Sequence, residues 1–222
     1  YIIDYSNSVL DRLRSEKQTY LINIGTSILC PCKPLMDIWS NLGNKLSNFK
    51  IKIIPFDDDN KSILNTIEGL GNNIDLIVSS CDSKSWLNIC NFHKLGDYHF
   101  CIAIPKKHYL SKREIIHLSD LKGQTVMIMK EGESKSNTLL RNDIEKFALS
   151  SQIIDAPYFY DLETFNKAEE NGTLLITLDC WKDLHPSLVT LPLDTKYKIP
   201  YGILYSKNPK KEVLEFLKLI KD

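Results

Sequence analysis

Hydroxyl side chains follow the first apolar segment of the chain. Residues 20–24 are mostly apolar, Gly25 comes next, and then Thr26 and Ser27 stand before a predicted helix. A helix N-terminus offers free N–H groups and a partial positive charge, so hydroxyls placed there can help to bind an anion. Hydroxyl residues are also common helix caps. Two interpretations of Thr26 and Ser27 therefore stay open, a ligand contact and a cap.

A second loop of this kind follows the apolar segment 125–129. It runs from Lys130 to Ser136, contains two glutamates and two serines, and leads into another predicted helix. In open α/β sheets, ligands bind beyond the carboxyl ends of the strands. Two such loops that face each other would form a cleft, although Ser134 or Ser136 would again suit a helix cap.

Other reactive residues do not form a recognisable catalytic group. The five histidines are scattered, and the nucleophile elbow, P-loop, zinc-protease and dinucleotide-binding motifs are absent. The acidic run 57–59 suits either a solvated turn or a cation. Cys30 and Cys32 could form a metal or redox pair, but no His/Cys cluster lies near them in sequence. We expect free thiols, no catalytic residues, no cofactor and no metal site.

The net charge and the composition of the chain limit the class of protein. The formal net charge is 0, which argues against a chain that grips nucleic acid by itself. A hydrophobic share of 43% allows a sizeable core, and no apolar run is long enough to cross a membrane. The chain starts at Tyr1 without an initiator Met or a secretory signal, so we expect a fragment or a processed product.

Apolar strands alternate with amphipathic helices along most of the chain, which predicts parallel sheets covered on both faces. Residues 1–17 carry a narrow apolar stripe and predict a helix that packs against another helix or against its own domain. The pattern predicts two α/β units with a break near residues 105–107. The expected strands are 20–24, 50–56, 74–79, 99–104, 125–129, 158–160, 173–178, 189–193 and 199–205, and the expected helices are 34–46, 61–70, 137–149, 162–170 and 209–221.

Four short motifs, in this order and spacing, resemble a known family. They are Ile-Asn-Ile-Gly-Thr-Ser at 22–27, Gly-Asn-Asn-Ile-Asp-Leu-Ile-Val at 71–78, Ile-Ala-Ile-Pro-Lys-Lys-His at 102–108 and Leu-Ser-Asp-Leu at 118–121. The sequence resembles the effector-binding domain of LysR-type transcriptional regulators over nearly its whole length. Two departures are a Tyr109-Leu110 pair where the family usually has Pro-Leu, and a single glycine, Gly172, where it has two.

The resemblance implies an α/β fold of two Rossmann-like lobes with mixed sheets, the type 2 periplasmic-binding-protein fold. Residues 1–18 would be the end of a linker helix, 19–105 with 200–222 lobe I, and 106–199 lobe II. It also implies a bacterial, cytoplasmic homodimer or tetramer that does not contact a membrane. DNA would be bound only through a winged helix-turn-helix domain that precedes the linker helix.

The resemblance further implies that a small effector binds between the lobes and shifts their arrangement. Its contacts would be Thr26, Ser27 and Ile28 in lobe I, and Glu131, Gly132, Glu133, Ser134 and Thr177 in lobe II. Hydroxyls and helix N-termini favour an anionic or zwitterionic effector, whose amine would face Glu131 and Glu133.

Two alternatives use the same architecture. One is an extracytoplasmic solute-binding protein that delivers its ligand to a transporter. The other is an enzyme, such as a phosphoribosyltransferase or a dehydratase, although the sequence shows neither the carboxylate cluster nor the glycine-rich phosphate loop that would support it.

Overall fold

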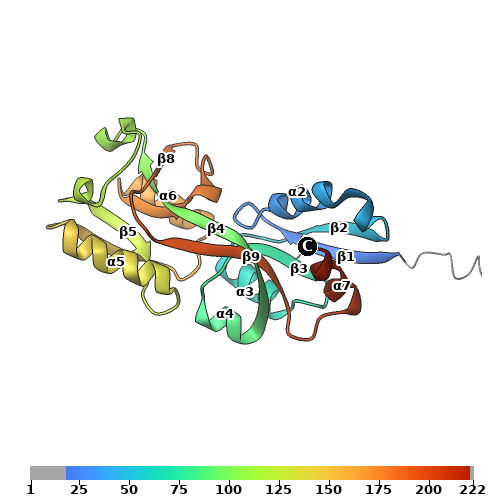
Figure 1. Ribbon diagram of the computed structural model, residues 1–222. Helices are drawn as coiled ribbons and strands as arrows, with labels where there is room; N and C mark the ends of the chain where they lie inside the picture. Colours follow the sequence, from blue (N-terminus) through green and yellow to red (C-terminus); the bar gives the residue numbers. More distant parts are fainter. Residues whose placement is uncertain (1–18, 221–222) are drawn as a thin grey trace, which may run out of the picture.

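The computed structural model describes residues 19–220, so the predicted linker helix, residues 1–18, lies outside the described part of the chain. The molecule is elongated and has two lobes (Figure 1). Two long strands, drawn in green and orange-red, run across its middle and join the lobes.

The strands of both lobes form one connected sheet in the order β2-β1-β3-β9-β4-β7-β5-β6, with β8 paired to β4. The strand pairs β1–β2, β1–β3, β5–β6 and β5–β7 are parallel, whereas β9 and β4 are antiparallel to their partners. The strands are β1 Tyr20–Thr26, β2 Phe49–Pro55, β3 Leu76–Ser80, β4 Cys90–Pro105, β5 Thr125–Met129, β6 Gln152–Ala156, β7 Leu174–Leu178, β8 Leu188–Pro192 and β9 Lys198–Ser206.

Helices cover the sheet in each lobe (Figure 1). The first lobe carries α2, α3, α4 and α7, and the second carries α5 and α6. Their bounds are α2 Lys33–Leu42, α3 Asn60–Glu68, α4 Lys84–Ile89, α5 Lys135–Phe147, α6 Leu162–Glu170 and α7 Lys211–Ile220.

Strand β4 carries the chain from one lobe to the other. Its first part, from Cys90 to His99, pairs with β9, and its last part, from Phe100 to Pro105, pairs with β7 and β8. The strand β9 then returns to the first lobe and pairs with β3. The predicted two lobes with mixed sheets are therefore confirmed, while the proposed division at residues 105 and 200 stays a prediction.

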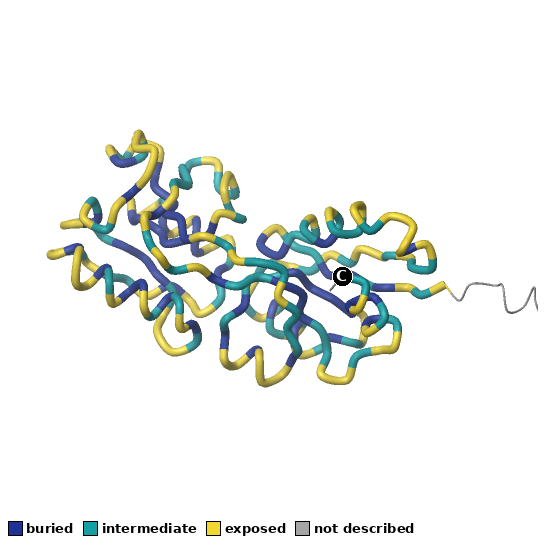
Figure 2. The backbone as a smooth tube through the Cα atoms, viewed as in Figure 1, coloured by how far each residue is buried: buried dark blue, intermediate teal, exposed yellow. Residues whose placement is uncertain are grey.

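Each lobe has its own apolar core, and buried residues follow the strands through both lobes (Figure 2). In the first lobe, Ile24 of β1 and Leu35 of α2 are fully buried and pack in one cluster with Phe216 of α7. In the second lobe, Ile128 of β5 and Leu140 of α5 are likewise fully buried. Burial of side chains of this size contributes about 1.5–3 kcal/mol each, which holds the helices on the sheet.

Gly25 allows β1 and the β3 region to approach closely. A Cβ atom at this position would lie 2.9 Å from Cγ2 of Ile74 and 3.1 Å from Cγ1 of Ile77. The glycine of the predicted strand end is thus required by packing, and a larger residue would push β3 away from β1.

Three predictions of local structure were wrong or incomplete. The strand expected at 158–160 is a loop, and β6 lies earlier, at Gln152–Ala156, where Ile153 and Ile154 pair with β5. The short helix α4 was missed, because its six residues directly follow a polar run. The strand at 99–104 begins nine residues earlier than expected, because its first part is only half-buried and mixes polar with apolar residues.

Candidate functional site

The loop after β1 uses its hydroxyls internally. The Oγ1 atom of Thr26 accepts a 3.2 Å hydrogen bond from the backbone N–H of Cys32, and the Oγ atom of Ser27 accepts one of 3.0 Å from Cys30. Both hydroxyls therefore hold the turn that leads into α2.

A carboxylate already occupies two backbone amides of this loop. Asp58, in the loop before α3, accepts hydrogen bonds from the backbone N–H groups of Ile28 at 2.8 Å and Leu29 at 3.2 Å. These amides are the donors that a bound anion would use here.

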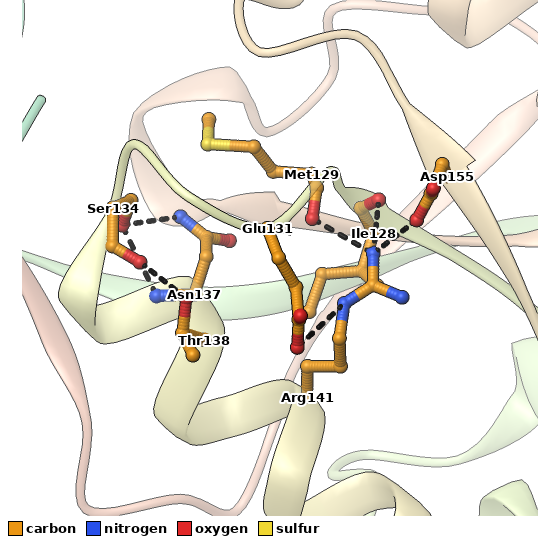
Figure 3. A network of polar contacts seen from close by, with 8 residues as sticks. All are labelled: Ile128, Met129, Glu131, Ser134, Asn137, Thr138, Arg141 and Asp155. Carbon is orange, nitrogen blue, oxygen red and sulfur yellow. Dashed lines mark hydrogen bonds and ion pairs between the residues drawn. The ribbon is translucent and has the colours of Figure 1, made fainter. Parts of the chain in front are cut away.

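The loop after β5 is fixed by the start of α5 (Figure 3). The Oγ atom of Ser134, which is buried, accepts hydrogen bonds from the backbone N–H and the side-chain amide of Asn137 at 3.1 and 2.9 Å. Ser134 is therefore the N-cap of α5, and its hydroxyl is engaged within the lobe.

Arg141 supports the same loop from below (Figure 3). Its buried guanidinium donates hydrogen bonds to the carbonyl of Met129 at 2.9 Å and to the Asp155 carboxylate at 2.6 Å. Its Nε atom lies 4.0 Å from the Glu131 carboxylate. Arg141 thus ties the end of β5 to β6.

Glu133 reaches across to the first lobe. Its Oε2 atom accepts a 2.8 Å hydrogen bond from the hydroxyl of Ser83 and one of 3.0 Å from the backbone N–H of Ser85. The Ser85 amide, with a further contribution from the Ser83 hydroxyl, lowers the pKa of the Glu133 carboxyl. The carboxylate of one lobe therefore caps the first turn of α4 in the other.

The first lobe provides a matching carboxylate for the second lobe. Asp82, in the loop after β3, accepts a 3.0 Å hydrogen bond from the backbone N–H of Ser136 in the first turn of α5. Ser83 and Ser134 also form an isolated antiparallel bridge between the two loops. We call the reciprocal caps made by Glu133 and Asp82 the interlobe clasp.

Further contacts close the lobes around the clasp. Trp86 of α4 stacks on Phe159 from the loop after β6, with ring centroids 4.4 Å apart and planes 19° apart. The indole N–H of Trp181 donates a 2.9 Å hydrogen bond to the carbonyl of Leu29. The structure is therefore a closed arrangement of the two lobes.

A cavity of about 60 Å³ lies between the lobes beside the clasp. It is smaller than the 300–1,000 Å³ typical of ligand pockets, so a ligand of ordinary size requires the lobes to open. Both lobes and the crossing strand β9 contribute to its wall, which consists of Leu29, Cys30, Ile63, Ser79, Ser80, Cys81, Asp82, Ser83, Trp86, Met129, Glu133, Ser134, Tyr158, Phe159, Tyr160, Trp181 and Ile199.

A smaller cavity of about 30 Å³ adjoins the first. The two share Ser80, Met129, Tyr160, Trp181 and Ile199 in their walls, and the smaller one is also lined by Asn137 and Thr177. The Thr177 side chain is 1% exposed, and its hydroxyl has no hydrogen-bond partner among the residues described.

The structure brings together some of the predicted site residues and not others. Glu133 and Ser134 line the main cavity, and Thr177 lines the smaller one. Glu131 and Gly132 instead line a separate outer groove with Lys84. The wall of neither cavity includes Thr26, Ser27 or Ile28, and Ile28 is 59% exposed.

Sequence reasoning missed the aromatic walls of the cavity. Trp86, Phe159, Tyr160 and Trp181 all line it, and each stands shortly after a strand end. That position was the available signal, but Trp86 lies in the missed helix, and Phe159 and Tyr160 lie in the segment taken for a strand.

The cysteines fit a role in packing. Cys30, Cys81, Cys90 and Cys101 are buried free thiols, as expected, whereas Cys32 and Cys180 are half-buried. Burial raises the pKa of Cys30 to about 11 and that of Cys81 to about 12, so neither is a thiolate at neutral pH. Within residues 19–220, no group of three or more His, Cys, Asp or Glu side chains is placed to share a metal ion, and no helix is long and apolar enough to cross a membrane.

Solved transcriptional regulators and effector-binding domains have a similar architecture. CbnR, a LysR family transcriptional regulator, matches with 12% identity and a TM-score of 0.62, over 99% of this chain and 76% of that one. The effector-binding domain of QuiR in complex with shikimate matches with 13% identity and a TM-score of 0.62, over 91% and 95%. The effector-binding domain of BenM with its effector benzoate matches with 14% identity and a TM-score of 0.55, over 91% and 90%.

The chain has the fold of the LysR effector-binding domains. The type 2 periplasmic-binding-protein fold implied by the sequence resemblance is therefore confirmed. At the level of sequence, no family model and no curated protein matches the chain.

Proposed function

We propose that this chain is the small-molecule-sensing domain of a LysR-type transcriptional regulator. The observation that carries the proposal is the interlobe cavity, because it lies between two lobes that are joined by two strands and held closed by a reciprocal pair of polar contacts. The fold and the four sequence motifs support the same function.

The mechanism is a shift between two arrangements of the lobes. A ligand that fits the cleft better in one arrangement than in the other changes their populations by its difference in affinity. The interlobe clasp is the element that such a ligand would bias, since its carboxylate residues Asp82 and Glu133 both line the cavity. In a homodimer or tetramer, that change would alter the spacing of DNA-binding domains that precede residue 1.

The expected ligand, the mode of DNA binding and the compartment are part of the same proposal. The effector is a small molecule, DNA is bound through the preceding winged helix-turn-helix, and the protein acts in the cytoplasm. No step of catalysis is assigned to the site.

The coding sequence immediately before Tyr1 tests the proposal. A winged helix-turn-helix that runs without a stop into residues 1–18 is the expected result. A signal peptide would contradict it in favour of a transport receptor, and a start codon directly before Tyr1 would contradict it in favour of a free-standing cleft protein.

A further inference from the structure

Two residues in the walls of the adjoining cavities each carry a buried polar group without a partner. The indole N–H of Trp86, whose residue is 5% exposed, and the hydroxyl of Thr177, at 1%, have no hydrogen-bond partner in the described part of the chain. Leaving a buried polar group unsatisfied costs about 1–3 kcal/mol. A molecule that enters the cavities and reaches these groups would offset that cost by forming hydrogen bonds with them.

The chemistry of these groups is that of neutral donors. An indole N–H can only donate, and a threonine hydroxyl can donate or accept. A ligand that satisfies Trp86 therefore carries an acceptor oxygen or nitrogen. A cationic ammonium group has donors only, so it cannot accept a hydrogen bond from the Trp86 indole.

The charges around the cavity disfavour an anion. Among the described residues that line either cavity, none is Lys, Arg or His, whereas Asp82 and Glu133 both line the main one. Lys84 acts on Glu133 but lines the outer groove, and Arg141 is bound to Met129 and Asp155. A carboxylate in the closed cavity would lose its hydration water, and no cation lines the cavity to compensate for that loss.

The backbone donors that would replace such a cation are also occupied. Ser85 and Ser136 donate to Glu133 and Asp82, and the amides after Ser27 donate to Asp58. The protein's own carboxylates thus occupy these backbone donors.

We propose that the cleft binds a compact uncharged molecule, with a carbonyl or similar acceptor for Trp86 and an apolar body between the aromatic walls. This inference rests on the proposed function and replaces the anionic or zwitterionic effector expected from the sequence. The second polar group of such a ligand would reach Thr177 in the smaller cavity.

Matched small probes test the ligand class on the purified chain. Propionamide, propionate and propylammonium have similar size and are neutral, anionic and cationic at about pH 7. The indole N–H signals of the three tryptophans would be followed by two-dimensional NMR during titration. We expect propionamide to shift the Trp86 signal and to bind roughly tenfold more tightly than the other two.

Substitutions assign the signal and test its origin. Trp86→Phe should remove the shifting signal and weaken binding, while Trp39→Phe, in the core of the first lobe, should leave both unchanged. Thr177→Val should also weaken propionamide binding. Tighter binding of propionate or propylammonium through the same signals would overturn the uncharged class but keep the cleft as a ligand site. If none of the three shifts a cleft signal at any soluble concentration, both the ligand class and the cleft site would be rejected.

Discussion

The carboxylate of Glu133, in the loop after β5, accepts a 3.0 Å hydrogen bond from the backbone N–H of Ser85, at the start of α4 in the other lobe. Asp82 makes the reverse contact with Ser136. Each lobe therefore adds a carboxylate to the first turn of a helix in its neighbour, and opening the cleft breaks both contacts, while the caps Ser83 and Ser134 stay within their own lobes.

Removing one half of the clasp should open the cleft. Glu133→Ala leaves the amide of Ser85 and the hydroxyl of Ser83 without their carboxylate acceptor, so the free energy of unfolding should fall by about 1 kcal/mol. The closed population should fall as well, which small-angle X-ray scattering would detect as a larger radius of gyration.

The control for this variant is a cap that lies within one lobe. Asp59 accepts hydrogen bonds from the backbone N–H and hydroxyl of Ser62 at the start of α3. Asp59→Ala should cost similar stability without changing the radius of gyration. Equal radii for Glu133→Ala and the wild type would show that the clasp does not hold the lobes closed.

The clasp should weaken in acid. The pKa of Glu133 is lowered from its ordinary value of 4.5, mainly by the amide of Ser85. A carboxyl with a lowered pKa in the folded state stabilises that state above its ordinary pKa, and this stability is lost as the pH falls through the lowered value. The stability difference between wild type and Glu133→Gln should therefore be constant near neutral pH. It should shrink once the pH falls below 4.5, the ordinary pKa of the carboxyl.

Urea unfolding of both proteins across this acid range provides the measurement. A stability difference that grows as the pH falls would have the wrong sign and would contradict the assignment of the Glu133 contact.

Thr177→Val should make the protein more stable and a poorer ligand binder. The buried hydroxyl of Thr177 has no partner within residues 19–220, so replacing it with a methyl group of similar size should raise the free energy of unfolding by about 1 kcal/mol. Thr164→Val is the matched control, because the buried Thr164 hydroxyl donates a 2.7 Å hydrogen bond to Asp161. This control should be destabilised, and a loss of stability in both variants would count against an unsatisfied Thr177.

Arg141→Met should loosen the loop after β5. The variant leaves the carbonyl of Met129 without its 2.9 Å donor and removes the ion pair with Asp155, at a cost of about 2 kcal/mol. Hydrogen exchange of residues 130–134 should become faster. Arg113→Met, at an exposed contact 4.0 Å from Asp120, should change stability by less than about 0.5 kcal/mol. Unchanged exchange in the Arg141 variant would show that the loop does not depend on it.

The sequence predicted the fold better than the site because strands and helices follow local periodicity. The strand 125–129 and the helix 162–170 were located with their correct bounds. In contrast, the partners of Glu133 and Asp82 lie about fifty residues away along the chain, and no local pattern reveals such a pairing. The sequence could not decide the role of Thr26 and Ser27, because hydroxyls that bind a ligand and hydroxyls that hold a turn occur at the same positions. The hydrogen bonds that they accept from Cys32 and Cys30 show the second role.

Footprinting of the full-length protein on the DNA upstream of its own gene tests the central claim most directly. We expect a protected segment, and we expect Glu133→Ala to change the length or spacing of that segment, because the variant shifts the lobes without touching the DNA-binding domain. The absence of any protected DNA, or the same footprint for wild type and variant despite a larger radius of gyration, would contradict a regulator that reads the state of its cleft.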